Sequence, residues 1–486
     1  MANFIPDWLR VRAELSSESL ALTDGHESWT FQQLHQVTGR IATRLARRGI
    51  SHGSRVALAM PGHMKVVPLI HAVSRLGAVL VPLNSRLRPD ELAALVEDAA
   101  VDALIGDGGE PHSERTILLD DLFLNLDTEP EHPGSAINPE AIQFLVYTSG
   151  TTGLPKGALL SYGNTYASAV SSAIHMGTGP EDLWLHMMPV FHIGGLSILF
   201  RSVITGSGIV WLPQFDPAAV FRLLREYPVT LMSVVPTMLY RLLRHNEAFP
   251  PTLRLVLLGG APAPSSLIEE ARIRNVPAVQ TYGLTETGSQ IATRLPSDQH
   301  GSPSSGHAIY PTEIAVLGPQ GPTQDAGVHG EILVKGPTVF QGYWRQPERT
   351  AETFWHDWLK TGDIGYLDGR GYLTVVDREK DLIIKGGENL SPTEIEVTLM
   401  AHPHVVDAGV VGIVDAEWGQ VPAAIVAVDQ PISVEELRQW TATRLSTLKH
   451  PSHYYQADAL PRTASGKLRR RELVSQLAAG LYRPIS

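Results

Sequence analysis

The chain has 486 residues and contains no cysteine, an absence that removes several classes of protein at once. Disulfide-stapled folds, thiolate nucleophiles, and zinc or iron–sulfur sites built on cysteine are excluded. A chain without thiols is compatible with a reducing compartment. The amino terminus also lacks the basic start and apolar core of a secretory signal peptide, so we expect a cytoplasmic protein.

Long apolar runs and long basic runs are missing as well. No window reaches about 18 consecutive apolar residues, so we expect no membrane-spanning segment. The net charge is −11 and the basic residues form no long block, which argues against nucleic acid as the main ligand. Apolar residues make up 43% and charged residues 18%, proportions typical of a globular protein. At this length two or more domains are expected.

Common catalytic signatures are also absent. No Gly-x-Ser-x-Gly elbow and no His-Glu-x-x-His motif occurs, so hydrolase-triad and zincin functions lack support. A P-loop requires Gly-Lys-Ser/Thr, whereas Lys156 stands between Pro155 and Gly157, so this template fails too.

Apolar runs of strand length alternate with segments of helical spacing through the first 283 residues. The expected strands are 55–60, 78–84, 102–107, 208–213, 230–236, 253–260 and 278–283, and the expected helices are 30–48, 66–76, 90–98, 217–226, 237–244 and 264–274. This alternation favours an α/β fold with parallel sheets and helices on both faces.

The pattern changes after about residue 310. Short strand-like runs separated by Gly, Asp and Pro indicate a β-rich subdomain. Beyond Asp377 come a helix over 392–400, two apolar strand-like runs, a helix over 434–445 and a basic tail. We therefore expect an N-terminal domain over residues 1–377, a hinge over 378–381 and a small α+β domain over 382–486.

The segment YTSGTTGLPKG, residues 147–157, follows the apolar run AIQFLV. Its small residues allow the backbone to approach a ligand closely, its hydroxyl and N–H groups can donate hydrogen bonds, and Lys156 adds positive charge. These properties suit a polyphosphate. A flexible surface turn is the alternative for any single glycine-rich loop.

This loop resembles the signature of the adenylate-forming enzymes, the superfamily of acyl-CoA synthetases, adenylation domains and luciferases. Further segments resemble the other motifs of the family, in the same order: LGGAP (258–262), YGLTE (282–286), KTGD (360–363), DREKD (377–381), GGENLSPTEIE (386–396) and PRTASGK (461–467). The resemblance covers nearly the whole chain. It implies a large N-terminal domain and a small, mobile C-terminal domain.

The resemblance also implies a reaction that uses ATP, Mg²⁺ and CoA. A carboxylate first attacks the α-phosphorus of ATP, giving acyl-AMP and pyrophosphate, and a thiol then displaces AMP. The first displacement mainly develops charge, so cationic groups and a metal are expected to stabilise it.

The same resemblance assigns most of the binding residues. They are Thr148, Ser149, Gly150, Thr151, Thr152, Gly153 and Lys156 at the phosphates, Gly259, Gly260, Ala261 and Tyr282 around the adenine, Asp363 at the ribose, Gly283, Thr285 and Arg378 as further cofactor-binding residues, and Gly387, Glu388 and Asn389 along the pantetheine path. Glu286 is expected to bind Mg²⁺, because a hard cation between phosphate oxygens takes a carboxylate. A solvated glutamate at a helix start is the alternative.

Lys467, Arg378 and His192 are the expected catalytic residues. By resemblance, Lys467 bridges the substrate carboxylate and the α-phosphate during adenylation. Lys380 is the expected hinge, about which the small domain rotates between the two steps. A solvated basic tail is the alternative for Lys467, and it describes Arg469 to Arg471 well.

The stretch 188–206 and the residues after YGLTE are expected to form the acyl pocket. His192 matches a gate position of the family, although a histidine beside apolar residues is usually structural. Arg201 lies in an expected buried helix, where a charge is costly unless it is paired. The alternative is an arginine at a helix end that reaches solvent. A paired Arg201 would suit an acid with a second carboxylate.

Two segments narrow the expected acid. FHIGGLSILFRS and YGLTETGSQI resemble the o-succinylbenzoate–CoA ligases of menaquinone synthesis, a branch of the family. We therefore expect His192, Arg201, Ser289 and Gln290 to recognise that acid. Another acyl- or aryl-CoA synthetase and a stand-alone adenylation module that loads a carrier protein stay open. So does the oligomeric state, for which a homodimer is one option.

Overall fold

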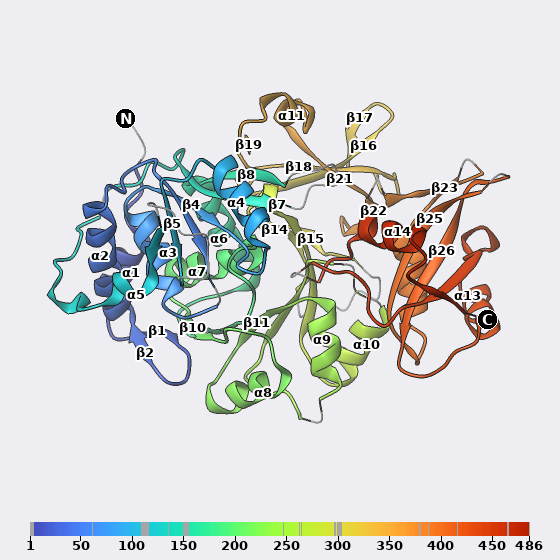
Figure 1. Cartoon of the computed structure of the whole chain (residues 1–486), viewed down its shortest axis with the longest axis horizontal. Coiled ribbons are helices and arrows are strands. Elements are labelled where there is room, and N and C mark those ends of the chain that lie inside the picture. Colours follow the sequence, from blue (N-terminus) through green and yellow to red (C-terminus); the bar gives the residue numbers. More distant parts are fainter. Residues whose placement is uncertain are drawn as a thin grey trace.

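The computed structural model describes residues 4–60, 62–107, 116–134, 136–148, 155–245, 247–261, 263, 265–295, 298, 304–378, 381–386, 388–415, 417–463 and 466–485. Figure 1 shows an α/β body in blue and green, strands β16 to β21 along its upper edge, and a C-terminal unit in orange and red at one end. Each helix among these residues is too short or too polar to cross a bilayer.

Sheet A has the order β19-β8-β7-β4-β3-β5-β6. Its strands are β3 (Arg55–Ala59), β4 (Val79–Pro82), β5 (Ala103–Gly106), β6 (Thr116–Leu118), β7 (Ile142–Thr148), β8 (Lys156–Ser161) and β19 (Gly342–Tyr343), and the helices of this part are α1 (Trp8–Leu15), α2 (Phe31–Arg47), α3 (Val66–Arg75), α4 (Pro89–Asp98) and α5 (Leu119–Phe123). β3 to β7 pair in parallel, whereas β8 returns antiparallel to β7. The glycine-rich segment therefore connects two neighbouring strands.

Sheet B has the order β15-β14-β13-β12-β11-β9-β10-β1-β2. Its strands are β1 (Leu20–Thr23), β2 (Ser28–Thr30), β9 (Leu183–His186), β10 (Gly208–Trp211), β11 (Leu231–Val234), β12 (Leu255–Leu258), β13 (Ala278–Leu284), β14 (Ser289–Thr293) and β15 (His307–Ala308), and its helices are α6 (Tyr162–Met176), α7 (Ile193–Thr205), α8 (Pro217–Glu226), α9 (Pro236–Leu243) and α10 (Ser265–Ile273). The strands from β1 to β13 along this order pair in parallel. Their continuous Val, Leu and Ile runs fit strands that are covered on both faces.

A shared core joins the two sheets. It takes in buried side chains from β3, β4 and β7 of sheet A and from β9, β11 and β12 of sheet B. α7 contributes Phe200, whose ring lies 5.3 Å from that of Phe144 on β7. Such a layered arrangement of sheets and helices confirms the expected α/β class.

Sheet C is antiparallel and forms the expected β-rich region. It consists of β16 (Glu313–Gly318), β17 (Gly321–Thr323), β18 (Gly330–Lys335), β20 (Phe354–Trp355), β21 (Trp358–Leu367) and β22 (Leu373–Arg378), with α11 (Pro347–Glu352) before β20.

Sheet D belongs to the C-terminal unit, which has a hydrophobic cluster of its own. Its strands are β23 (Ile383–Lys385), β24 (Glu388–Leu390), β25 (Val405–Asp415), β26 (Gly419–Val428), β27 (His453–Gln456) and β28 (Arg483–Pro484), and its helices are α12 (Pro392–Met400), α13 (Val434–Ala442) and α14 (Arg470–Ala478).

The prediction that the basic tail is solvated is wrong for Arg470. Its guanidinium pairs with the buried carboxylate of Glu396, donates to the Val410 carbonyl at 2.9 Å and reaches Asp381 at 3.2 Å. A run of three arginines does not reveal that the middle one meets a carboxylate 74 residues earlier in the chain.

Candidate active site

The carboxyl ends of β11, β12 and β13 lie side by side, and those of β12 and β13 carry two of the expected segments, LGGAP and YGLTE. Open parallel sheets bind ligands in the crevice outside these strand ends. Gly259 to Ala261 follow β12 directly. A Cβ on Gly259 would lie 2.8 Å from the Thr281 side chain, and Gly260 has a φ of +80°, which glycine adopts readily. The turn therefore exposes bare backbone beside Tyr282.

Tyr282 joins sheet B to sheet C. Its hydroxyl donates to the Asp363 carboxylate at 2.6 Å, although the two residues are 81 positions apart. Asp363 is buried and is held by its own turn, in which the Thr361 hydroxyl accepts from the Asp363 N–H at 3.1 Å. The Gly362 N–H in turn donates to the Glu331 carboxylate at 2.9 Å. The structure thus brings the expected adenine and ribose residues into contact.

The two ends of the glycine-rich loop are paired, because Thr148 and Lys156 are register partners of β7 and β8. Ser149, Gly150, Thr151, Thr152 and Gly153 lie outside the described residues. The Lys156 ammonium lies 4.9 Å from the centre of the Tyr343 ring. Lys156 therefore marks where the loop returns to the sheet.

Glu286 lies in the 3₁₀ turn η2 (Thr285–Thr287) and is half-buried, which disagrees with the solvated alternative. Its Oε1 accepts a hydrogen bond from the Tyr343 hydroxyl at 2.7 Å, and its carbonyl accepts from the Phe340 N–H at 2.9 Å. Glu286 and Lys156 both contact Tyr343, so the three residues form one cluster.

The neighbouring Gly283 cannot carry a side chain. A Cβ there would lie 1.7 Å from the Ser289 carbonyl oxygen, and Ser289 itself has a φ of +114°. Strained backbone of this kind is concentrated at functional sites. The turn between β13 and β14, which carries Thr285 and Glu286, is therefore tightly constrained.

Arg201 is buried, so the solvent-reaching alternative is wrong. The residue is 4% exposed, and its Nε and Nη2 have no hydrogen-bond partner among the residues that the structure describes. Burial lowers the pKa of its guanidinium to about 10. Arg201 is thus a buried cation, and no carboxylate of the described residues forms an ion pair with it.

The Arg201 cavity is small and leaves about 10 Å³ of room for the centre of a water-sized sphere. Its lining residues are Phe144, Thr165, Ser168, Ala169, Ile193, Ser197, Arg201 and Gly288. The Ser197 hydroxyl, one helical turn before Arg201 on α7, is buried and also has no partner within the described part of the chain. Sequence reasoning missed Ser197, although its spacing of four residues from Arg201 places both on one helix face.

His192 directly precedes α7 and is half-buried. Its Nε2 has no hydrogen-bond partner among the described residues, and burial lowers the pKa of its imidazole to about 4. The ring is therefore neutral at pH 7. Its neighbour Ile193 lines the Arg201 cavity, whereas His192 is not among the lining residues.

The Gln290 side chain is engaged by the protein. Its Oε1 accepts from the Ser172 hydroxyl at 2.8 Å, and its Nε2 donates to the Thr281 and Thr293 hydroxyls at 3.2 and 3.3 Å. Its role in substrate recognition stays a prediction, as does that of Ser289.

Lys467 lies on a tight hairpin of the C-terminal unit. The Lys467 carbonyl accepts from the Thr463 N–H at 2.7 Å, and the Gly466 carbonyl accepts from the Arg462 guanidinium at 2.6 Å. A Cβ on Gly466 would lie 3.2 Å from the Val235 side chain, directly after β11. The hairpin therefore brings Lys467 to the carboxyl edge of sheet B.

The remaining expected residues of the C-terminal unit are less informative. Glu388 is exposed on β24. Arg378 and Asn389 are described by their backbone alone, at the end of β22 and within β24. Lys380 and Gly387 lie outside the described residues.

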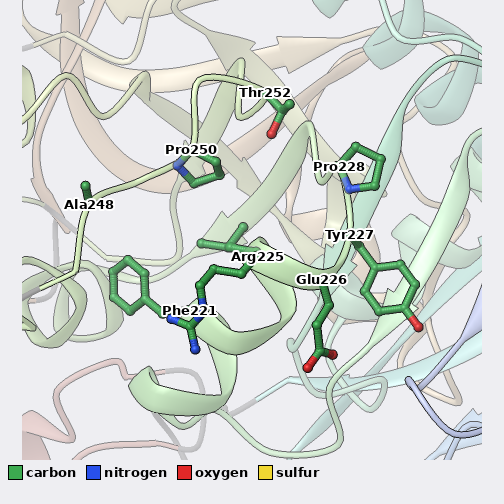
Figure 2. A pocket seen from close by; sticks show the side chains of 9 residues that line it. Phe221, Arg225, Glu226, Tyr227, Pro228, Ala248, Pro250 and Thr252 are labelled. Carbon is green, nitrogen blue, oxygen red and sulfur yellow. The ribbon is translucent and has the colours of Figure 1, made fainter.

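A second hollow, shown in Figure 2, lies between α8 and the 248–252 segment. It contains none of the motif residues. Arg225, which lines this hollow, forms an ion pair with Glu247. We therefore assign the site to the carboxyl edge of sheet B and the Arg201 cavity.

Two family models together match most of the chain. Residues 9–344 match the family model of the AMP-binding enzymes, and residues 394–467 match that of the AMP-binding enzyme C-terminal domain. A 2-succinylbenzoate–CoA ligase from Bacillus licheniformis is 41% identical over 479 residues, which cover 96% of this chain and 99% of that protein.

Two solved structures extend the comparison. o-Succinylbenzoate CoA synthetase from Bacillus subtilis, in complex with the acyl-adenylate intermediate OSB-AMP, is 39% identical with a TM-score of 0.91, covering 97% of this chain and 98% of that chain. A double mutant of the Bacillus subtilis enzyme, bound with its product analogue OSB-NCoA, is 38% identical with a TM-score of 0.75, covering 100% of both chains. By its sequence matches and its fold, the chain belongs to the family of AMP-binding enzymes.

Proposed function

We propose that the chain is a 2-succinylbenzoate–CoA ligase that forms AMP and acts in the menaquinone pathway. The substrate carboxylate attacks the α-phosphorus of ATP and releases pyrophosphate, leaving an acyl-AMP. The CoA thiol then attacks the acyl carbon, loses its proton and releases AMP. The relatives that match nearly the full length of the chain carry this name and support the proposal. A cytoplasmic location is part of the proposal.

The observation that carries the substrate assignment is the buried Arg201 guanidinium, whose Nε and Nη2 have no hydrogen-bond partner among the described residues. A buried charge without a partner is strongly destabilising, so a ligand that supplies an opposite charge gains both the ion pair and its hydrogen bonds. 2-Succinylbenzoate has two carboxylates: one reacts with ATP, and the other can pair with Arg201. An acid with a single carboxylate would leave Arg201 unpaired once the first carboxylate had reached the nucleotide.

The ATP assignments fit the arrangement at sheet B. Gly259, Gly260 and Ala261 offer flat backbone to the adenine beside Tyr282, and Asp363 offers a carboxylate to the ribose. Residues 148–153 and Lys156 are proposed to hold the β- and γ-phosphates. The nucleotide is also proposed to contact Gly283, Thr285 and Arg378.

A Mg²⁺ ion that binds together with ATP requires oxygen ligands from the protein. Among the described residues, no group of three or more His, Asp or Glu could hold a metal ion by itself. Mg²⁺ at nucleotide sites usually takes one or two carboxylates, with phosphate and water oxygens completing its shell. Glu286 fits this pattern and is the proposed ligand. Mg²⁺ bound there would neutralise charge on the phosphates.

Lys467 is proposed to orient the substrate carboxylate toward the α-phosphorus. Its hairpin lies against Val235, and the chain superposes better on the adenylate complex than on the complex with the CoA product analogue. Both observations support an arrangement of the domains suited to the first step. For the second step, the unit 382–486 is proposed to rotate at Lys380, within the hinge 378–381, so that Gly387, Glu388 and Asn389 face the pantetheine.

A panel of acids tests the proposal. CoA-thioester formation with ATP and Mg²⁺ should strongly favour 2-succinylbenzoate over benzoate, cinnamate, and medium- and long-chain fatty acids. Equal or faster turnover of a monocarboxylate would contradict the substrate assignment while leaving the ATP site intact. An acyl-AMP that free CoA does not consume would indicate a module that loads a carrier protein.

A further inference from the structure

Tyr343 lies between two residues that the proposed function assigns to MgATP. Its hydroxyl donates to Glu286 Oε1 at 2.7 Å, and its ring centre lies 4.9 Å from the Lys156 ammonium. Among the described residues, Tyr343 is the one that hydrogen-bonds the Glu286 carboxylate. One side chain therefore contacts both the expected metal ligand and the lysine that ends the glycine-rich loop.

Tyr343 is itself held firmly. β19 pairs with β8, with Tyr343 opposite Ala158, and this pairing ties it to the strand that begins at Lys156. The Tyr343 N–H donates to the Thr350 hydroxyl at 2.9 Å. The side chain is 7% exposed and its ring packs edge-on against Phe340, whose N–H binds the Glu286 carbonyl. The hydroxyl can therefore fix the direction of the Glu286 carboxylate.

We propose that Tyr343 is a positioning residue that sets the Glu286 carboxylate and the Lys156 ammonium for MgATP, an inference that rests on the proposed function. The hydroxyl engages Oε1 and thereby directs Oε2 toward the phosphate side. The ring face limits the positions of the ammonium. Such partners of a metal ligand commonly change metal affinity by about 10- to 100-fold when they are removed.

Two substitutions separate the roles of hydroxyl and ring. Tyr343→Phe keeps the ring but removes the hydrogen bond to Glu286, whereas Tyr343→Leu removes both contacts. Tyr482→Phe is the matched control, because it removes a hydroxyl that donates to Gln476 within the C-terminal unit. All three variants are made in the full chain, and thermal unfolding is recorded for each.

The first measurement is binding of Mn²⁺ in the presence of a nonhydrolysable ATP analogue, followed by the loss of the free Mn²⁺ signal in electron paramagnetic resonance. Tyr343→Phe should raise the Mn²⁺ dissociation constant about tenfold and leave the analogue's own affinity without metal unchanged. Tyr343→Leu should weaken both. The Mg²⁺ concentration that half-saturates pyrophosphate release should follow the Mn²⁺ result, and Tyr482→Phe should match the wild type.

Two results would overturn the inference: unchanged Mn²⁺ binding in Tyr343→Phe, with or without a loss of thermal stability, or tighter Mn²⁺ binding. Mn²⁺ binding to Glu286→Gln distinguishes an error in the role of Tyr343 from an error in the proposed metal site. If Glu286→Gln weakens Mn²⁺ binding and Tyr343→Phe does not, only the role of Tyr343 is wrong. If neither weakens it, the assignment of Glu286 is wrong as well.

Discussion

Replacing Arg201 with leucine should separate recognition of the second carboxylate from the chemistry of the first. The guanidinium is 4% exposed and its Nε and Nη2 lack partners within the described part of the chain. Removing one member of a buried ion pair costs about 3–5 kcal/mol, so kcat/KM for 2-succinylbenzoate should fall by a factor on the order of 100 or more. 3-Benzoylpropionate, the same acid without its ring carboxylate, should lose nothing from the substitution.

The same variant should be more stable than the wild type when no substrate is bound. The Arg201 guanidinium is buried, and this burial lowers its pKa to about 10. Replacing unfavourable buried charge with a hydrophobic side chain commonly gains about 1 kcal/mol or more. The unfolding midpoint should therefore rise by a few degrees in calorimetry.

Steady-state thioester formation with both acids is the assay for Arg201→Leu. Arg225→Leu serves as the control, because Arg225 lies on the surface of α8 beside the other hollow, as Figure 2 shows. This substitution should leave kcat/KM unchanged for both acids. Equal losses for the two acids would mean that Arg201 only supports the fold. No loss for either acid would refute the recognition of a second carboxylate.

Three further predictions concern other parts of the structure. Lys467→Ala should slow acyl-AMP formation by about 100-fold or more, while thioester formation from supplied acyl-AMP changes little; separate assays of the two half-reactions check this, and equal losses would contradict it. Gly283→Ala should lower the unfolding midpoint and weaken ATP binding, because its Cβ would lie 1.7 Å from the Ser289 carbonyl oxygen; wild-type stability in calorimetry would count against this crowding. Burial lowers the pKa of His71 to about 4, so as pH falls from 6.5 toward 4 the unfolded chain binds a proton that the folded chain does not, and stability is lost. That histidine should account for about 2 kcal/mol of the loss between pH 7 and pH 5; urea unfolding of His71→Leu at both pH values should show a drop smaller by that amount, and an unchanged drop would exclude the effect.

The sequence predicted the elements of the α/β body well. The expected helix over 30–48 is α2 (Phe31–Arg47), and the expected strand over 55–60 is β3 (Arg55–Ala59). These segments have strong apolar periodicity and clear stops at Gly and Pro, so local sequence determines them. The resemblance to the adenylate-forming family is confirmed by matches over most of the chain.

Contacts between distant segments could not be read from the sequence. Sequence reasoning left Arg201 balanced between a paired and a solvent-facing state, since a helix pattern does not show what packs against each face. Tyr343 reaches Glu286 across 57 residues, and no local signal marks that contact. The engagement of the Gln290 amide by three hydroxyls is likewise a product of packing between α6 and sheet B.

The most direct test of the central claim is a single-turnover experiment with excess enzyme, 2-succinylbenzoate, ATP and Mg²⁺, in which the products are identified by mass spectrometry before and after CoA is added. The proposed function predicts that succinylbenzoyl-AMP and pyrophosphate form first, and that CoA then converts the adenylate to the thioester and AMP. An adenylate that never forms, or one that persists after CoA is added, would contradict it.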